Sequence, residues 1–161
     1  MTARSGKSPG AGKKYFLSLE NLSDGDTIAL PDVLSRLVFN DQGLIPVVTQ
    51  DNATGEVLMF AWMDQAALER TVATGQMTYF SRSRGELWIK GETSGSFQWV
   101  EDMRFDCDGD VLLCRVRQEG SACHTQRRSC FYLKVESQDN SVVIDSAPWL
   151  PSMVREESGE R

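Results

Sequence analysis

Alternating hydrophobic and polar positions dominate the chain from residue 44 onward, and this period of two indicates β-strands. Two such runs, 44–50 and 56–62, flank the turn cluster DNATG, which is typical of a hairpin. Asp108-Gly109 indicates a second hairpin farther along the chain. The same pattern predicts further strands at 77–83, 86–91, 97–107, 111–118, 131–136 and 141–145.

Two segments in the first half of the chain have helical spacing instead. Residues 31–39 begin with Pro31 and place apolar side chains at helical intervals. Residues 65–74 follow Asp64, a favourable N-cap, and stop at Gly75. The expected fold class is therefore α+β and mostly β, a small strand-rich domain with one or two helices in the first half.

The length of 161 residues suits a single domain with its own core, which we place at residues 15–150. Residues 1–14 are rich in Gly, Ser and Lys and are expected to form a disordered basic tail. Residues 151–161 are expected to be a frayed C-terminal tail. No apolar run is long enough for a membrane span or a secretory signal. We therefore expect a soluble, cytoplasmic protein with no membrane partner.

The net charge of the chain bears on whether it binds nucleic acids. The net charge is −6, and removing the +4 of residues 1–14 leaves −10 for the remainder. A body this acidic repels phosphate backbones, so nucleic-acid binding is not expected. A small anionic substrate is still possible where basic side chains converge.

All four cysteines lie within 24 residues of one another, and a reducing compartment favours metal binding or catalysis over disulfides. Cys114 alternates with apolar neighbours and is assigned to the core. Cys107, Cys123 and Cys130 lie in polar segments. Their spacing is not that of a zinc ribbon, and both a metal site and small buried side chains fit it. Three thiolates on zinc would leave an open position for a water.

Asp106, Asp108 and Asp110 stand at alternate positions, which in a strand would put them on one face. Their repulsion would be relieved by a cation, and Mg²⁺ suits oxygen ligands. The alternative is a solvated turn. Strict alternation also puts Cys107 on the opposite face, unless the turn breaks the alternation, and the sequence leaves this question open.

The segment SRSRGELWIKGETSGS, residues 81–96, combines glycines, hydroxyl side chains and three cations, a composition that suits phosphate binding. It matches no Walker or dinucleotide pattern, and a polar hairpin is the alternative. The single histidine, His124, follows Cys123 directly. It is a candidate general base, although a lone histidine is often structural.

Between about residues 43 and 132, the segments together resemble the phosphoribosyl-AMP cyclohydrolases of histidine biosynthesis. The matching segments, in the family's order, are GLIPVVTQD with TGEVLMFAWM, YFSRSR, LWIKGETSG, DCDGD and ACHTQRRSCFY. The last three are highly specific in combination. Four positions depart from residues common in the family, and they leave the presumed metal ligands intact: Asp64, Ala66, Ser96 and Gln126.

The resemblance implies hydrolytic opening of the adenine ring of phosphoribosyl-AMP between N1 and C6, giving the phosphoribosyl-formimino-AICAR nucleotide. It implies zinc and magnesium as cofactors. His124 is our own candidate for the catalytic proton shuttle in this reaction. The implied zinc ligands are Cys107, Cys123 and Cys130, and the implied magnesium ligands are Asp106, Asp108 and Asp110. The residues assigned to substrate binding are Arg82, Arg84 and Lys90, for the two phosphates, with Glu92, Thr93 and Ser94.

The resemblance also implies a pseudobarrel-like domain in an intertwined homodimer, with zinc thiolates supplied by both subunits. Only about thirty residues follow Phe131, so a monofunctional enzyme is expected rather than a fusion with a pyrophosphohydrolase domain. The alternative function is a non-catalytic zinc-binding or thiol-redox module. A deaminase of free nucleosides is disfavoured, because the chain lacks the His-x-Glu and CxxC segments of that class.

Overall fold

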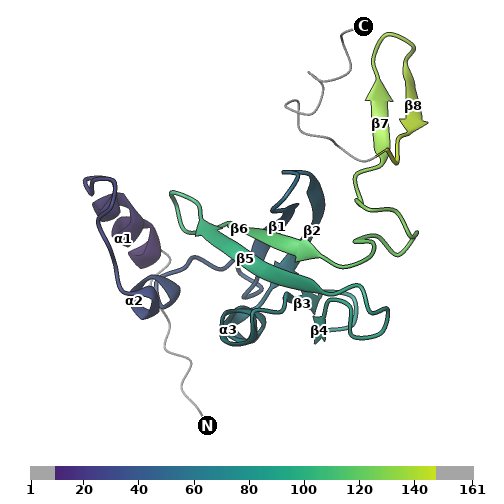
Figure 1. Cartoon of the computed structure of the whole chain (residues 1–161). Helices are drawn as coiled ribbons and strands as arrows, with labels where there is room; N and C mark the ends of the chain where they lie inside the picture. The colour runs from purple at the N-terminus through teal and green to yellow at the C-terminus, as the bar shows by residue number, and fades with distance from the viewer. Residues whose placement is uncertain (1–9, 148–161) are drawn as a thin grey trace, which may run out of the picture.

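The computed structural model describes residues 10–147, and Figure 1 shows a four-stranded sheet with small helices and hairpins around it. This confirms the α+β, mostly β, fold class. No helix in that range is long and apolar enough to cross a membrane. The elements are α1 (Ala11–Leu19), α2 (Leu30–Leu34), β1 (Ile45–Asp51), β2 (Val57–Met63), α3 (Gln65–Thr74), β3 (Thr78–Ser81), β4 (Glu86–Ile89), β5 (Gln98–Phe105), β6 (Leu112–Gln118), β7 (Leu133–Glu136) and β8 (Ser141–Ile144).

The four-stranded sheet has the order β2-β1-β6-β5. Its outer pairs are antiparallel hairpins, and the central pair β1–β6 is parallel. Both predicted hairpins are confirmed. The β1–β2 turn is closed by the Asp51 carboxylate, which accepts hydrogen bonds from the backbone N–H and the hydroxyl of Thr54, both at 2.8 Å. The β5–β6 turn contains Gly109 at φ +69°, a conformation that favours glycine.

The β3–β4 hairpin lies beside this sheet. The residue before β3, Met77, is joined to β5 because its N–H donates to the Gln98 carbonyl at 3.0 Å. β3 itself packs next to β2. Tyr79 from β3 packs with the apolar side chains of β1, β2 and β6, and together they form the core. Cys114 is fully buried there, which confirms its core assignment, and burial raises the pKa of its thiol to about 12. Closure into a pseudobarrel and pairing into a dimer stay predictions.

One predicted helix is confirmed and one is wrong in extent. α3 spans the expected residues, with the Asp64 carboxylate accepting from the Ala67 N–H at 2.8 Å and Gly75 left-handed at φ +73°. α2 ends at Leu34, although the spacing predicted a helix through residue 39. The N–H of Val38 donates instead to the Gly109 carbonyl at 2.8 Å, so a contact with the β5–β6 turn replaces the helical hydrogen bond.

α1 occupies residues that the sequence analysis assigned partly to a disordered tail. Residues 11–14 belong to this helix, whereas residues 1–9 and the predicted C-terminal tail, 151–161, lie outside the described range. The helix is held by Phe16, which is 5% exposed and packs in the core. Its ring lies against Gly109, where no side chain would fit. This tertiary contact has no local signature in the sequence.

Candidate functional site

The loop between β6 and β7, residues 119–132, carries two of the three candidate zinc ligands. It is fixed to β2, because the Cys130 N–H donates to the Leu58 carbonyl at 2.7 Å and the Ser129 hydroxyl donates to the Val57 carbonyl at 2.7 Å. The Cys123 N–H closes the loop onto the Arg127 carbonyl at 3.1 Å. These bonds hold Cys123 and Cys130 within hydrogen-bond reach of one another.

The two thiols have opposite acidities. Burial raises the pKa of Cys123, but hydrogen bonds from the side chain and backbone of Thr125, the Cys130 thiol and the charge of Arg127 together lower it below the usual value. The Thr125 hydroxyl lies 3.0 Å from the Cys123 sulfur. Burial and the neighbouring Cys123 raise the pKa of Cys130 to about 11. Of the two thiols, Cys123 therefore loses its proton more readily, and Cys130 acts as the hydrogen-bond donor.

Lys90 has the features of a binding-site cation. It is only 9% exposed, and it interacts electrostatically with both thiols. Burial lowers the pKa of its ammonium group, while Cys130 and Cys123 act in the opposite direction. None of the ion pairs within residues 10–147 includes Lys90. Its charge is therefore available to the thiols and to an anionic ligand.

Lys90 also lines a cavity of about 240 Å³ beside the β3–β4 hairpin. The tight turn there requires Gly91, which has φ +92° and lies against the Phe97 backbone. Five of the six residues assigned to substrate binding share this cavity: Arg84, Lys90, Glu92, Thr93 and Ser94. The sixth, Arg82, lies elsewhere, with its guanidinium 5.0 Å from the centre of the Trp62 ring.

The aspartate segment forms the turn after β5 rather than a continuation of the strand. One carboxylate oxygen of Asp106 accepts from the N–H groups of Asp110 and Val111, at 3.0 and 3.2 Å. The pKa of Asp110 is raised, chiefly by desolvation. A hydrogen bond with Asp106 and the negative charges of Asp106 and Asp108 raise it further. The three carboxylates thus sit within electrostatic range, and the turn breaks the strict alternation.

The structure does not bring Cys107 to the other two thiols. Cys107 precedes β6 and is exposed, whereas Cys123 and Cys130 follow it. A seven-residue strand spans about 20 Å, and Figure 1 shows the two loops at opposite ends of β6. Across residues 10–147, no three His, Cys, Asp or Glu side chains converge as a metal site. The donor types fit zinc and magnesium, but neither expected set of three ligands is gathered at one point within the described part of the chain.

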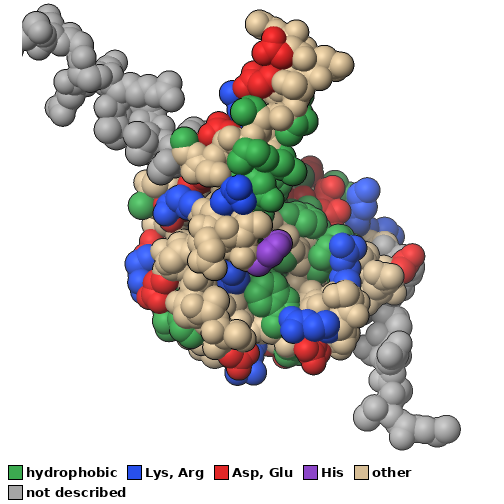
Figure 2. Space-filling view, turned by 90° about the vertical axis from the view of Figure 1, so that its right-hand side faces the viewer, with side chains coloured by type: hydrophobic (Ala, Val, Ile, Leu, Met, Phe, Trp, Pro, Cys, Tyr) green, Lys and Arg blue, Asp and Glu red, His purple; other side chains and the backbone are tan. Residues whose placement is uncertain are grey.

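His124 is exposed, next to the thiol pair in sequence. Figure 2 shows the histidine on a face where hydrophobic, Lys and Arg side chains surround it. An imidazole in this position can exchange protons with solvent and with a ligand bound near the thiols. The structure thus leaves His124 accessible for the role predicted from the sequence.

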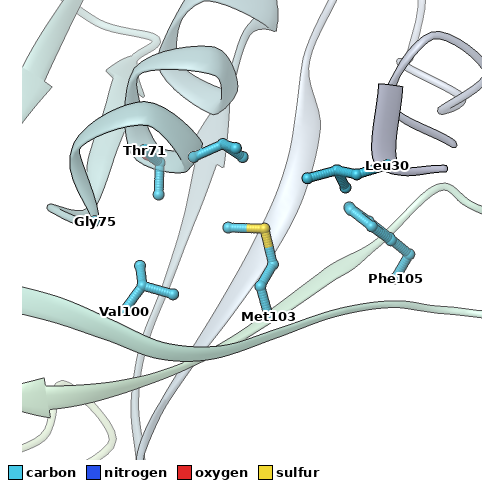
Figure 3. Close-up of a pocket in the computed structure, with 7 residues that line it drawn as sticks. Leu30, Thr71, Gly75, Val100, Met103 and Phe105 are labelled. Atoms are coloured by element: carbon cyan, nitrogen blue, oxygen red, sulfur yellow. The ribbon is translucent and has the colours of Figure 1, made fainter. Parts of the chain in front are cut away.

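Another cavity carries no candidate chemistry. It measures about 350 Å³ and lies between α2, α3 and β5, where Val100, Met103 and Phe105 face Leu30 and Thr71 (Figure 3). None of the residues that line it is titratable. We therefore treat it as a packing gap between the helices and the sheet.

Sequence reasoning missed residues that shape the thiol pair rather than bind a ligand. Thr125 and Arg127 lower the pKa of Cys123, and Arg128 pairs with Asp51 and Glu56 from the β1–β2 turn. The run QRR between the two cysteines was the only hint of these roles in the sequence. The partners of its last residue, Arg128, lie about seventy residues earlier in the chain, so the pairing could not be predicted.

Comparison with known proteins gives a consistent result. The family model described as phosphoribosyl-AMP cyclohydrolase matches residues 59–132. A phosphoribosyl-AMP cyclohydrolase of Alcanivorax borkumensis is 54% identical over 133 residues, 83% of this chain and 92% of the relative. One of Halorhodospira halophila is 51% identical over 129 residues, 80% and 89% of the two chains. One of Cereibacter sphaeroides is 55% identical over 111 residues, 69% and 93%.

Proposed function

The chain belongs to the phosphoribosyl-AMP cyclohydrolase family, and from this we propose that it hydrolyses the N1–C6 bond of phosphoribosyl-AMP. The activity of the family is a hydrolytic step of histidine biosynthesis. In the balanced reaction the oxygen of water becomes the carboxamide oxygen at C6 and the C6–N1 bond breaks. One proton of the water goes to N1, and the other goes to the exocyclic imino nitrogen on C6, which becomes the carboxamide nitrogen. The observation that carries the proposal is the pair Cys123–Cys130 beside the buried cation Lys90.

The zinc ligands in this proposal are Cys107, Cys123 and Cys130. Zinc held by three protein ligands supplies a Lewis acid that activates water at neutral pH. Cys123 loses its proton more readily than an ordinary cysteine, because hydrogen bonds from Thr125 and Cys130 and the charge of Arg127 lower the pKa of its thiol. Cys130 must lose its proton on binding, and the nearby charge of Lys90 favours that loss.

The substrate's two phosphates are proposed to bind the cations of the β3–β4 region. Arg84 and Lys90, with the hydroxyls of Thr93 and Ser94, line one cavity and supply donors for one phosphate. Glu92, at the same rim, is a candidate acceptor for a ribose hydroxyl. Arg82, which stacks on Trp62, is the candidate for the other phosphate.

Magnesium is proposed to bind the turn of Asp106, Asp108 and Asp110. Carboxylate oxygens are its preferred protein ligands. Desolvation and then repulsion from Asp106 and Asp108 raise the pKa of Asp110, and a cation would relieve that repulsion. His124 is proposed to carry a proton between the site and N1 of the opening ring. It is exposed and adjacent to Cys123, so it can reach both ligand and solvent.

A second copy of the chain is proposed to supply Cys107 to the Cys123–Cys130 pair. Two features support a homodimer. Cys107 lies at the opposite end of β6, beyond reach within one chain. The β7–β8 hairpin stands apart from the sheet and exposes Leu133, Val135 and Val142 by 58–68% (Figure 1). An isolated two-stranded hairpin is marginal in water, so these side chains favour a protein partner.

Ring opening by the purified protein tests this function. The protein is incubated with phosphoribosyl-AMP and zinc, with and without magnesium, and the ultraviolet absorbance of the purine is followed. We expect turnover that is lost when a chelator removes zinc and restored when zinc is added back. Absence of any absorbance change with the zinc-loaded protein would refute the activity, and turnover that survives complete zinc removal would refute the cofactor.

A further inference from the structure

An ion-pair cluster connects the cysteine loop to the β1–β2 turn, and none of its members is a proposed metal ligand or lines the substrate cavity. The Arg128 guanidinium donates to the Glu56 carboxylate at 2.7 Å and lies 3.2 Å from the Asp51 carboxylate. The two acidic side chains are 11% and 6% exposed. Arg128 thus joins the loop to the β1–β2 turn, more than seventy residues earlier in the chain.

The β1–β2 turn fixes the Asp51 carboxylate and the backbone of Glu56 without help from Arg128. Asp51 accepts from the backbone and hydroxyl of Thr54, and its own N–H donates to the Glu56 carbonyl at 2.8 Å. Two nearly buried carboxylates this close repel one another unless a cation lies between them. The turn therefore presents a preformed acceptor for one guanidinium, whose planar fork can bind both acids.

The backbone of Arg128 controls the position of both thiols. Its carbonyl accepts from the Ala122 N–H at 3.1 Å, directly before Cys123. The next residue, Ser129, is fixed to β2 and is followed by Cys130. A displacement of Arg128 would therefore shift Cys123 relative to Cys130, which β2 holds in place.

We propose that Arg128 is a positioning residue, which holds Cys123 and Cys130 at the separation that a metal requires before the metal binds. This inference rests on the proposed zinc site. The physical reason is preorganisation: fixed ligands lose less freedom on binding, and groups that orient metal ligands contribute to metal affinity.

The test is zinc affinity of the full-length protein, measured by competition with a chromophoric chelator. Arg128→Gln is expected to bind zinc about 10- to 100-fold more weakly than the wild type, the range typical of lost outer-sphere support. Arg104→Gln is the matched control, since it removes the same charge from a pair with Asp102 on the exposed part of β5. Its zinc affinity is expected to be unchanged.

Two further measurements separate positioning from general stability. Thermal unfolding of the metal-free variants shows whether each is folded at the assay temperature. At saturating Co²⁺, Arg128→Gln is expected to give the wild-type sulfur-to-cobalt absorption, because both thiols are still present. Wild-type zinc affinity in a folded Arg128→Gln protein would overturn the positioning role.

Milder variants decide the question if Arg128→Gln does not fold. Arg128→Lys keeps the charge without the fork, and Glu56→Gln keeps the shape with one acid neutralised. Weakened zinc binding in both supports the proposal, and wild-type affinity in both overturns it. A wild-type protein that takes up no zinc would contradict the proposed cofactor, and the positioning role with it. Wild-type protein that binds zinc as tightly as the variants would contradict the positioning role alone.

Discussion

At the scale of single side chains, Lys90 joins the two halves of the candidate site. It lines the cavity that contains Arg84 and Thr93, and it interacts electrostatically with both thiols of the cysteine loop. A lysine that is 9% exposed loses much of its hydration, so a phosphate or a thiolate gains more from its charge than from that of an exposed lysine. Lys90 is therefore the residue whose loss should affect substrate binding most clearly.

Replacing Lys90 by methionine is expected to lower kcat/KM for phosphoribosyl-AMP about 10- to 100-fold. The reason is the loss of a charge-assisted hydrogen bond, which contributes about 1.5–3 kcal/mol. Lys13→Met is the control, because Lys13 is exposed on α1, which carries none of the residues assigned to substrate binding. Steady-state kinetics of both zinc-loaded variants measures the effect. Equal kcat/KM values for the two variants would contradict the assigned role.

At the scale of helices and strands, the sequence predicted those elements whose ends are determined by neighbouring residues. α3 and both hairpins follow from a cap, a stop and turn residues, all of which lie within a few positions of each element. α1 and the early end of α2 instead depend on Gly109, about seventy residues later or more. The thiols and aspartates are recognisable in the sequence by residue type. The Arg128 cluster and the separate position of Arg82 arise only in the folded sheet.

Gly109→Ala is expected to destabilise the fold more than a glycine replacement elsewhere at a similar backbone angle. A Cβ there would collide with the Phe16 ring, and overpacking costs about 1–3 kcal/mol in addition to about 1–2 kcal/mol of left-handed strain. Gly85→Ala is the matched control, since Gly85 has φ +67° with open space around it. Urea unfolding compares the free energies of unfolding. Equal losses for both variants would refute the packing of α1 on the aspartate turn.

At the scale of the whole molecule, the parallel pair β1–β6 divides the candidate chemistry between two ends of one sheet. The aspartate turn and Cys107 precede β6, while Cys123, Cys130 and the Arg128 cluster lie beyond its other end. Sequence spacing alone did not separate these groups, because cysteines within 24 residues appear close until a strand extends between them. If the three thiolates bind one zinc, as we propose, this arrangement requires a second copy of the chain to supply Cys107.

The most direct measurement of the central claim is the ring-opening activity of a purified mixed dimer. One subunit carries Cys107→Ala and the other Cys123→Ala, each with its own affinity tag, and sequential purification isolates the pair. Each variant alone should be inactive. The mixed dimer contains one site with all three thiolates, so we expect about half of the wild-type, zinc-dependent turnover per dimer. A mixed dimer as inactive as either parent would contradict a hydrolase whose zinc is shared between two copies of the chain.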